Sequence, residues 1–401
     1  MKSDINKLII NEIKIEVFKS GIKKNKSDLL LITLPENSSI SGVFTKSFSS
    51  SAAVNFCKEN LKSKYKNARA ILVNSGNSNA FTGSNGIKCV QTLLTYLAKK
   101  LNCNEKEIFT ASTGVIGEFL DPKIIINSLK KNAPYSKNFW PEAAKSIMTT
   151  DTFHKIAHTS CMIENQKINI IGIAKGSGMI APNMATMLSF IFTDANISSG
   201  VLQKLLNVNN EKTFNSITVD SDTSTSDTVL LTSTNTKNHK RITNFFDPKL
   251  NHFKVSIFQL MLNLAKKIVV DGEGATKLIH IKVINAVSEK SAKKIGMSIA
   301  NSPLVKTAIA GEDANWGRII MAIGKSYEKI NLDKVKIYFE DELVTFKGMK
   351  YKKYSEKKVT KYLKRNEINI FVDVGIGDKS WSVYTCDLTE NYIKINADYR
   401  S

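Results

Sequence analysis

The amino-acid sequence predicts a fold that mixes helices and strands, of either the α+β or the α/β class. Short apolar runs alternate along the chain with stretches of helical periodicity. Several of these runs end in loops rich in glycine and asparagine, which is typical of strand ends. With 42% hydrophobic residues in 401, the chain can fill a large core, and its length favours two or three domains or one large two-part fold. Periodicity alone does not decide whether the strands run parallel.

In the first third of the chain, each predicted strand leads into a loop of small polar residues. A buried strand at Arg69–Val73 precedes the loop Asn74–Gly83, and Ile87–Leu101 has the spacing of an amphipathic helix. A short strand at Glu107–Thr110 ends at Ser112-Thr113-Gly114. Asp121-Pro122 then begins a helix, because proline in the first turn loses no hydrogen bond.

The middle of the chain places a glycine-rich loop between two apolar strands. Ile168–Ala174 and Met187–Thr193 are the predicted strands, and Lys175–Pro182 is the loop. Beyond them, the pattern predicts a helix and two strands, at Val255–Val270, Leu278–Ile284 and Ile368–Val374.

The chain carries a large positive charge that is spread along its length. There are 57 Lys and Arg against 36 Asp and Glu, a formal charge of +21, and only five of the cations are arginines. Arginine supplies the forked contacts that read bases, whereas lysine is a solvated point charge. A solvated surface is therefore favoured over a nucleic-acid-binding face, which needs clustered charge. The nucleic-acid alternative predicts retention on DNA that falls steeply with salt.

The composition also limits cofactors and compartment. The five cysteines lie far apart without a CxxC pair, so free thiols in a reducing compartment are expected. No run approaches the ~18 apolar residues of a spanning helix, and we expect a cytoplasmic protein without membrane contact. Ile319 stands where a P-loop needs its first glycine, and Thr225 stands where a calcium loop needs glycine. No glycine-rich dinucleotide-binding motif follows a predicted strand. We therefore predict no metal and no cofactor.

The most unusual segment is the loop and strand Lys175–Phe190, K-G-S-G-M-I-A-P-N-M-A-T-M-L-S-F. Thr186 lies at the junction of loop and strand, after the small residue Ala185. A hydroxyl at such a junction can be held exposed against a rigid sheet. On spacing alone, a plain hairpin with Thr186 as an ordinary strand residue is the simpler interpretation, since threonine is common in strands.

This segment closely resembles the nucleophile region of the ornithine acetyltransferases, the glutamate N-acetyltransferase family of arginine biosynthesis. The similarity continues in the same order through most of the chain. It includes the segments Asn74–Ala80, Ala111–Gly117, Met148–Thr152, Asp271–Lys277, Asn315–Arg318 and Asn396–Ser401. Two positions depart from the family pattern, His154 and Ala314, where proline is common. These departures loosen backbone restraints and remove no reactive group.

The resemblance implies an α+β fold, a layered sandwich of sheets flanked by helices, similar to the N-terminal-nucleophile hydrolases but differently connected. It implies a chain that cuts itself between Ala185 and Thr186. The products would be an alpha chain, residues 1–185, and a beta chain, residues 186–401, which remain together. Two such pairs would associate into a heterotetramer.

The implied chemistry uses Thr186 as the nucleophile. A threonine hydroxyl needs a base, and self-cleavage frees an α-amino group with a reference pKa of about 7.7–8.0 on the same residue. Its oxygen would take the acetyl group of N-acetylornithine and pass it to glutamate, and some members also accept acetyl-CoA. By the same resemblance, Thr113 and Gly114 form the oxyanion hole. The implied substrate-binding residues are Thr149, Lys175, Thr186, Glu273, Asn396 and Ser401. The enzymatic alternative is a related N-terminal-nucleophile amidase or aminopeptidase that passes the acyl group to water.

Overall fold

The computed structural model describes residues 10, 12–63, 67–131, 135–136, 140–181 and 187–397. It divides the chain into two compact units, each discontinuous in sequence. The first unit comprises Met1–Phe214 and Asp222–Ala265, and the second comprises Asn215–Ser221 and Lys266–Ser401. Within the described residues, no helix is both long enough and apolar enough to cross a bilayer.

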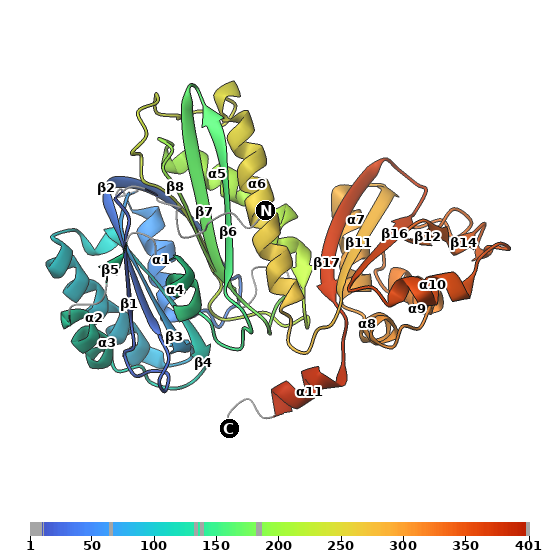
Figure 1. Cartoon of the computed structure of the whole chain (residues 1–401), viewed down its shortest axis with the longest axis horizontal. Coiled ribbons are helices and arrows are strands. Elements are labelled where there is room, and N and C mark those ends of the chain that lie inside the picture. The colour runs from blue at the N-terminus through green and yellow to red at the C-terminus, as the bar shows by residue number, and fades with distance from the viewer. Residues whose placement is uncertain are drawn as a thin grey trace. The chain divides into compact units, whose positions relative to one another are not determined.

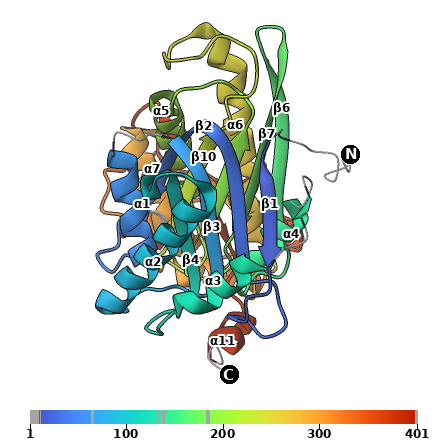
Figure 2. The same cartoon turned by 90° about the vertical axis from the view of Figure 1, so that its left-hand side faces the viewer.

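The first unit is built on one large mixed sheet (Figures 1 and 2). Its nine described strands are β1 (Lys14–Phe18), β2 (Leu29–Phe44), β3 (Asn67–Asn77), β4 (Ile108–Val115), β5 (Tyr135–Ser136), β6 (Lys155–Ile163), β7 (Gln166–Lys175), β8 (Leu188–Thr193) and β10 (Thr228–Ser233). The main order is β4-β3-β2-β10-β8-β7-β6, with β1 paired to β2 and to β5. The β3–β4 and β8–β10 pairs are parallel, whereas β2–β3 and β7–β8 are antiparallel.

Both faces of this sheet are apolar because its strands are buried on both sides. In β2, Leu30 and Ile32 belong to one core cluster, and Leu29 and Leu31 belong to another. Successive strand residues point to opposite faces, so these clusters lie on the two sides of the sheet. The helices of this unit are α1 (Ala52–Lys62), α2 (Gly83–Leu101), α3 (Pro122–Lys130), α4 (Trp140–Ser146), α5 (Ser199–Lys212) and the greater part of α6 (Asn251–Val270).

The helices divide between these faces. Helices α2 and α3 pack on the cluster that contains Leu29, and α4 packs on the cluster that contains Leu30. Helix α6 lies over β7, where a Cβ atom on Gly172 would meet Leu264 at 2.8 Å and Leu260 at 2.9 Å. A glycine at this point of β7 lets helix and sheet approach closely.

The second unit has its own sheet of six described strands in the order β13-β12-β16-β11-β17-β9. Their bounds are β9 (Ile217–Thr218), β11 (Leu278–Ala286), β12 (Lys336–Phe339), β13 (Glu342–Leu343), β16 (Glu367–Asp373) and β17 (Lys379–Cys386), and a separate hairpin joins β14 (Thr345–Phe346) to β15 (Met349–Lys350). The helices are α7 (Glu289–Ala300), α8 (Pro303–Ala310), α9 (Trp316–Gly324), α10 (Glu356–Leu363) and α11 (Glu390–Ala397). The alternating residues Ile279, Ile281 and Val283 of β11 share a core with Ile295 and Ile299 of α7.

The α+β class with sheets flanked by helices is confirmed in both units. The predicted strand Arg69–Val73 lies within β3, and the predicted helix Ile87–Leu101 is most of α2. Helix α3 begins at Pro122 as expected, and the Asp121 side chain accepts a hydrogen bond from the Lys123 amide. Helix α6 begins at Asn251, four residues before the predicted start, because a helical turn at Pro248–Leu250 leads into it.

The strand order bears directly on the predicted cut between residues 185 and 186. Strands β8 and β10 follow the cut, yet they lie between β2 and β7, which precede it. Backbone hydrogen bonds therefore join the two predicted fragments at both the β2–β10 and the β7–β8 interface. Fragments divided at this bond would be held together by one continuous sheet.

Candidate functional site

The predicted oxyanion residues Thr113 and Gly114 lie at the end of β4, beside the end of β3. Gly114 has φ +128°, and it is paired with Gly76 across the two strands. A Cβ atom on Gly114 would lie 2.3 Å from the Gly76 carbonyl carbon and 2.6 Å from the Asn77 nitrogen. Only glycine has both the conformation and the small size that this position requires. The Gly114 amide is thereby held in a fixed direction at the end of the strand.

We expect Gly114→Ala to reduce acetyl transfer by roughly 10²-fold or more, because the added methyl group must displace β3 or β4 and so move the predicted oxyanion donors. The matched control is Gly117→Ala. Gly117 also has a positive φ, +84°, but nothing lies within 4 Å of its added Cβ atom. Steady-state rates of the two purified variants provide the measurement. Equal rates for both variants would contradict the assignment of Gly114.

Lys175 is the last residue of β7 and contacts the predicted oxyanion residue Thr113. Its side chain is buried, and its Nζ atom donates to Thr113 Oγ1 at 3.2 Å. A buried cation beside a threonine hydroxyl and a glycine turn favours an anion at this place. The structure therefore brings Lys175 and Thr113 together, although 62 positions separate them in the chain.

Asp151 connects Thr149 to the same cluster. Its Oδ2 atom accepts from the Thr149 amide at 3.0 Å, and its Oδ1 atom accepts from the Gly176 amide at 2.7 Å. Lys155 Nζ donates to Oδ1 at 2.6 Å, and both side chains of this ion pair are fully buried. Burial alone would raise the pKa of Asp151, but the charges of Lys175 and Lys155 and the Gly176 amide hold it below its ordinary value. Asp151 thus fixes Thr149 and the start of the glycine-rich loop.

Asp227 is a buried carboxyl group beside the residue that follows Thr186. Its Oδ1 atom accepts from the Met187 amide at 2.9 Å, and its Oδ2 atom has no hydrogen-bond partner among the described residues. Burial raises the pKa of Asp227 well above its ordinary value, against the opposing effects of the Met187 amide and the Lys175 charge. Burial therefore favours the protonated form of this carboxyl group, and its contact with the Met187 amide fixes the first residue after the predicted nucleophile.

The second unit brings together two further predicted residues. Asn396 of α11 donates from Nδ2 to Glu273 Oε2 at 2.9 Å. The Glu273 side chain lies in the loop after α6, where Gly274 packs so closely on α11 that a Cβ atom would meet the Tyr392 nitrogen at 2.5 Å. A carboxylate whose second oxygen stays available can accept a hydrogen bond from a substrate ammonium. Ala185, Thr186 and Ser401 lie outside the described residues.

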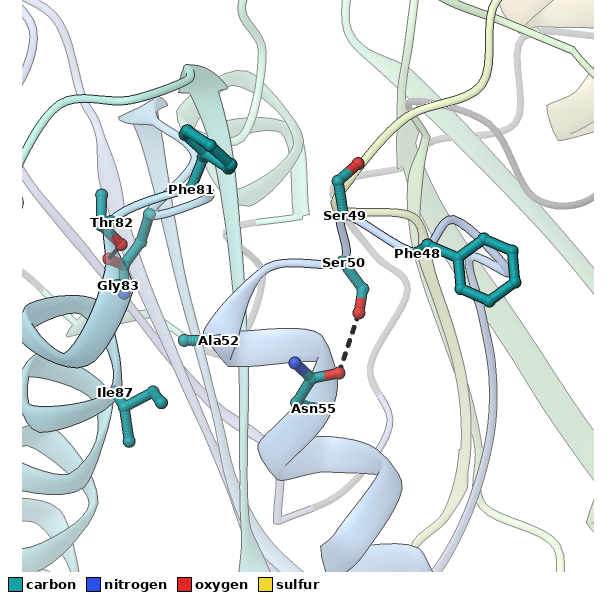
Figure 3. A pocket seen from close by; sticks show the side chains of 10 residues that line it. Phe48, Ser49, Ser50, Ala52, Asn55, Phe81, Thr82, Gly83 and Ile87 are labelled. Carbon is teal, nitrogen blue, oxygen red and sulfur yellow. Dashed lines mark hydrogen bonds between the residues drawn. The ribbon is translucent and has the colours of Figure 1, made fainter.

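A surface pocket of about 500 Å³ in the first unit contains none of the predicted site residues. It lies between the segment before α1 and the segment before α2, and Figure 3 shows the Ser50 hydroxyl bonded to Asn55 at 2.9 Å in its wall. Phe48 and Phe81 line it and are highly exposed. No titratable side chain lines this pocket, so it offers no general acid or base.

Burial disfavours the ionised form of all five cysteine thiols. Cys57 and Cys89 are buried, and burial raises the pKa of each thiol to about 12. Burial likewise raises the pKa of Cys161 to about 11. A thiol is unreactive until it is ionised. In the part of the chain that the structure describes, no group of three or more His, Cys, Asp and Glu side chains could hold a metal ion.

Sequence patterns did not assign roles to Asp151, Lys155 and Asp227, although Asp151 lies in a segment that carries the resemblance. Charged residues are mostly exposed, so a sequence gives no direct sign that these three are buried. The pairing of Asp151 with Lys155 at a spacing of four residues is a weak signal, since most such pairs lie on helix surfaces. Their burial depends on the order of the strands in the sheet, which local sequence patterns do not predict.

The described site holds a cation at the end of β7 and, at the end of β4, a hydroxyl group and a glycine amide, an arrangement suited to an acyl-transferring enzyme. The family model described as "ArgJ family" matches residues 14–401. Two curated relatives carry the name "Arginine biosynthesis bifunctional protein ArgJ". The one from Rhizobium meliloti is 48% identical over 97% of this chain and 95% of its own length. The one from Brucella suis is 47% identical over 98% of this chain and 96% of its own length.

The chain belongs to the ArgJ family, and the family predicted from the sequence is confirmed. A crystal structure of Arginine biosynthesis bifunctional protein argJ from Bacillus halodurans is 39% identical, covers 51% of this chain and 95% of that chain, and superimposes with a TM-score of 0.49.

Proposed function

We propose that the protein transfers the acetyl group of N2-acetyl-L-ornithine to L-glutamate through an acetyl ester on Thr186. The observation that carries the proposal is the match to the ArgJ family over residues 14–401, together with curated relatives of arginine biosynthesis at 47–48% identity. This family membership favours an acetyltransferase of arginine biosynthesis over the hydrolytic and nucleic-acid-binding alternatives.

Before it can transfer acetyl groups, the chain cleaves itself between Ala185 and Thr186. The Thr186 hydroxyl oxygen adds to the Ala185 carbonyl carbon, the carbon–nitrogen bond breaks, and the nitrogen takes the proton that the hydroxyl group lost. Water then hydrolyses the resulting ester, which leaves a carboxylate on Ala185 and a free amino group on Thr186. The alpha chain is residues 1–185 and the beta chain is residues 186–401, and the shared sheet supports their remaining together.

In acetyl transfer, the Thr186 amino group takes the hydroxyl proton as the oxygen attacks the acetyl carbonyl carbon. Thr113 and Gly114 stabilise the oxyanion, and the proton is delivered to the departing α-nitrogen of ornithine. Glutamate then attacks the acetyl ester with its own amine and regenerates the hydroxyl group. Thr149, Lys175, Glu273, Asn396 and Ser401 bind the substrate, with Lys175 on the α-carboxylate and Glu273 on an ammonium group. Two alpha and two beta chains form the assembly.

The word "bifunctional" in the relatives' names favours a second donor. Acetyl-CoA presents the same acetyl carbonyl group to the nucleophile, and glutamate would accept from the same ester. The reaction with acetyl-CoA as sole donor is tested by measuring N-acetylglutamate formed when N-acetylornithine is left out.

The acceptor requirement tests the proposed reaction. Without glutamate, we expect the protein to release about one ornithine per site in a burst and then to stop, because the acetyl ester persists until an acceptor amine is present. With glutamate, turnover continues and N-acetylglutamate accumulates. Ornithine and acetate are followed by rapid quench and chromatography. Continuous release of both without glutamate would instead identify a hydrolase, the enzymatic alternative.

A further inference from the structure

Lys23 lies in a loop between β1 and β2 that a buried carboxylate holds in place. Asp28 accepts hydrogen bonds from the backbone amides of Ser20, Gly21 and Lys23 at 2.6, 3.0 and 2.9 Å. The Asp28 side chain is fully buried. Three charge-assisted hydrogen bonds to these amides fix the backbone from which the Lys23 side chain projects.

The Lys23 side chain extends to two segments of the candidate site. Its Cγ atom would lie 2.8 Å from a Cβ atom on Gly76, and Gly76 is the strand partner of the predicted oxyanion residue Gly114. Its Nζ atom donates to the Met148 carbonyl oxygen at 3.0 Å, one residue before the predicted substrate contact Thr149. An ammonium group has three donors, so further donors remain for an anion.

The charges around Lys23 favour an added anion. Lys23 is half-buried, and burial lowers the pKa of its ammonium group to about 8. The charges of Asp28 and Asp151 act against this decrease, and those of Lys26 and Lys175 add to it. The negative charge of Asp151 is already paired with Lys155 at 2.6 Å. Three lysines, Lys23, Lys26 and Lys175, act here against two carboxylates, Asp28 and Asp151, and this excess of positive charge favours an added carboxylate.

We propose that Lys23 is a substrate-binding residue that, with Lys175, holds the α-carboxylate common to N-acetylornithine and glutamate. The inference rests on the proposed acetyl transfer. In N-acetylornithine the α-carboxylate carbon is three covalent bonds from the acetyl carbonyl carbon, so the carboxylate must bind close to the oxyanion hole. Lys23 lies over the strand next to Gly114, where such a subsite is required.

The test compares Lys23→Met with Lys24→Met, which removes the same charge from the adjacent, exposed position. We expect Lys23→Met to raise KM for both N-acetylornithine and glutamate roughly 10- to 100-fold, with little change in kcat, because a contact present in both ground and transition states is lost. Lys24→Met should match the native protein. Lys23→Arg, which keeps the charge, should recover most of the affinity. If Lys23→Met changes the thermal unfolding of the protein, Lys23→Gln replaces it in the comparison.

Comparing inhibition by ornithine with inhibition by putrescine isolates the contribution of the α-carboxylate to binding, because putrescine is ornithine that lacks its carboxylate. Lys23→Met should weaken inhibition by ornithine roughly 10-fold or more and leave inhibition by putrescine unchanged. An equal loss for both inhibitors, or no loss for either, would overturn the proposal. If the native protein transfers no acetyl group, the proposed function fails. If the native protein transfers acetyl while Lys23→Met and Lys24→Met behave alike, only the assignment of Lys23 fails.

Discussion

We expect the Thr186→Ala variant to remain a single chain of 401 residues and the native protein to be recovered as fragments of 185 and 216 residues. Alanine has no hydroxyl group to attack the Ala185 carbonyl carbon, so neither the cut nor the acetyl ester can form. We expect acetyl transfer to fall by roughly 10⁴-fold or more, as in other enzymes that lose their nucleophile. Intact-mass analysis measures the cut, and N-acetylglutamate formation measures the transfer.

Thr186→Ser is the matched control, because serine keeps the hydroxyl group and lacks only the methyl group. It should cleave and transfer acetyl, at a reduced rate. If the Thr186→Ala chain still divides after residue 185, or still transfers acetyl at the native rate, Thr186 is not the nucleophile.

The second large effect is expected from Asp151→Ala, in the first unit. This change removes the carboxylate that pairs with the buried Lys155 ammonium group and that accepts from the Thr149 and Gly176 amides. Removing one partner of a buried ion pair costs roughly 3–5 kcal/mol of the free energy of unfolding. Denaturant unfolding followed by circular dichroism measures the loss. Acetyl transfer should also fall, since Thr149 and the loop after Lys175 lose their anchor.

The control is Glu59→Ala, which breaks the exposed Glu59–Lys62 pair at 2.8 Å. Exposed pairs contribute only about 0–1 kcal/mol, so this variant should unfold almost as the native protein does. A similar small loss in both variants would show that Asp151 does not anchor the fold.

The Asp151 carboxylate also makes the free energy of unfolding depend on pH. The pKa of Asp151 is lower in the folded chain than its ordinary value of about 3.9, so its ionised form stabilises the fold above that pH. This contribution is lost as the pH falls below about 4 toward the lower folded pKa. The free energy of unfolding of Asp151→Ala should therefore fall less on acidification than that of the native protein.

Local pattern was enough to predict many elements of the fold. The apolar run at Arg69–Val73 and the spacing of Val90, Leu93, Leu94 and Leu97 predict β3 and α2, because burial alone requires those periods. Sheet order could not be predicted in this way. The register that places Leu230 opposite Gly42 joins residues far apart in the chain, and no local signal specifies it.

The candidate site shows the same division. The resemblance predicted Thr113, Thr149 and Lys175, and the structure brings them into one cluster through Asp151. Lys23 is one of 52 lysines in the sequence, and nothing in its neighbours distinguishes it from the exposed Lys24. Its importance appears only when the fold places its side chain over Gly76. Charged residues acquire roles through burial and neighbours, which depend on tertiary structure.

Peptide mass spectrometry of the stalled enzyme tests most directly whether a liberated Thr186 carries the acetyl group. The native protein is mixed with N-acetylornithine in the absence of glutamate, quenched in acid and digested. We predict a peptide that begins at Thr186 and carries one acetyl group on the hydroxyl oxygen, which disappears when glutamate is added before the quench. An active protein that yields only peptides continuous through Ala185 and Thr186 would contradict the claim.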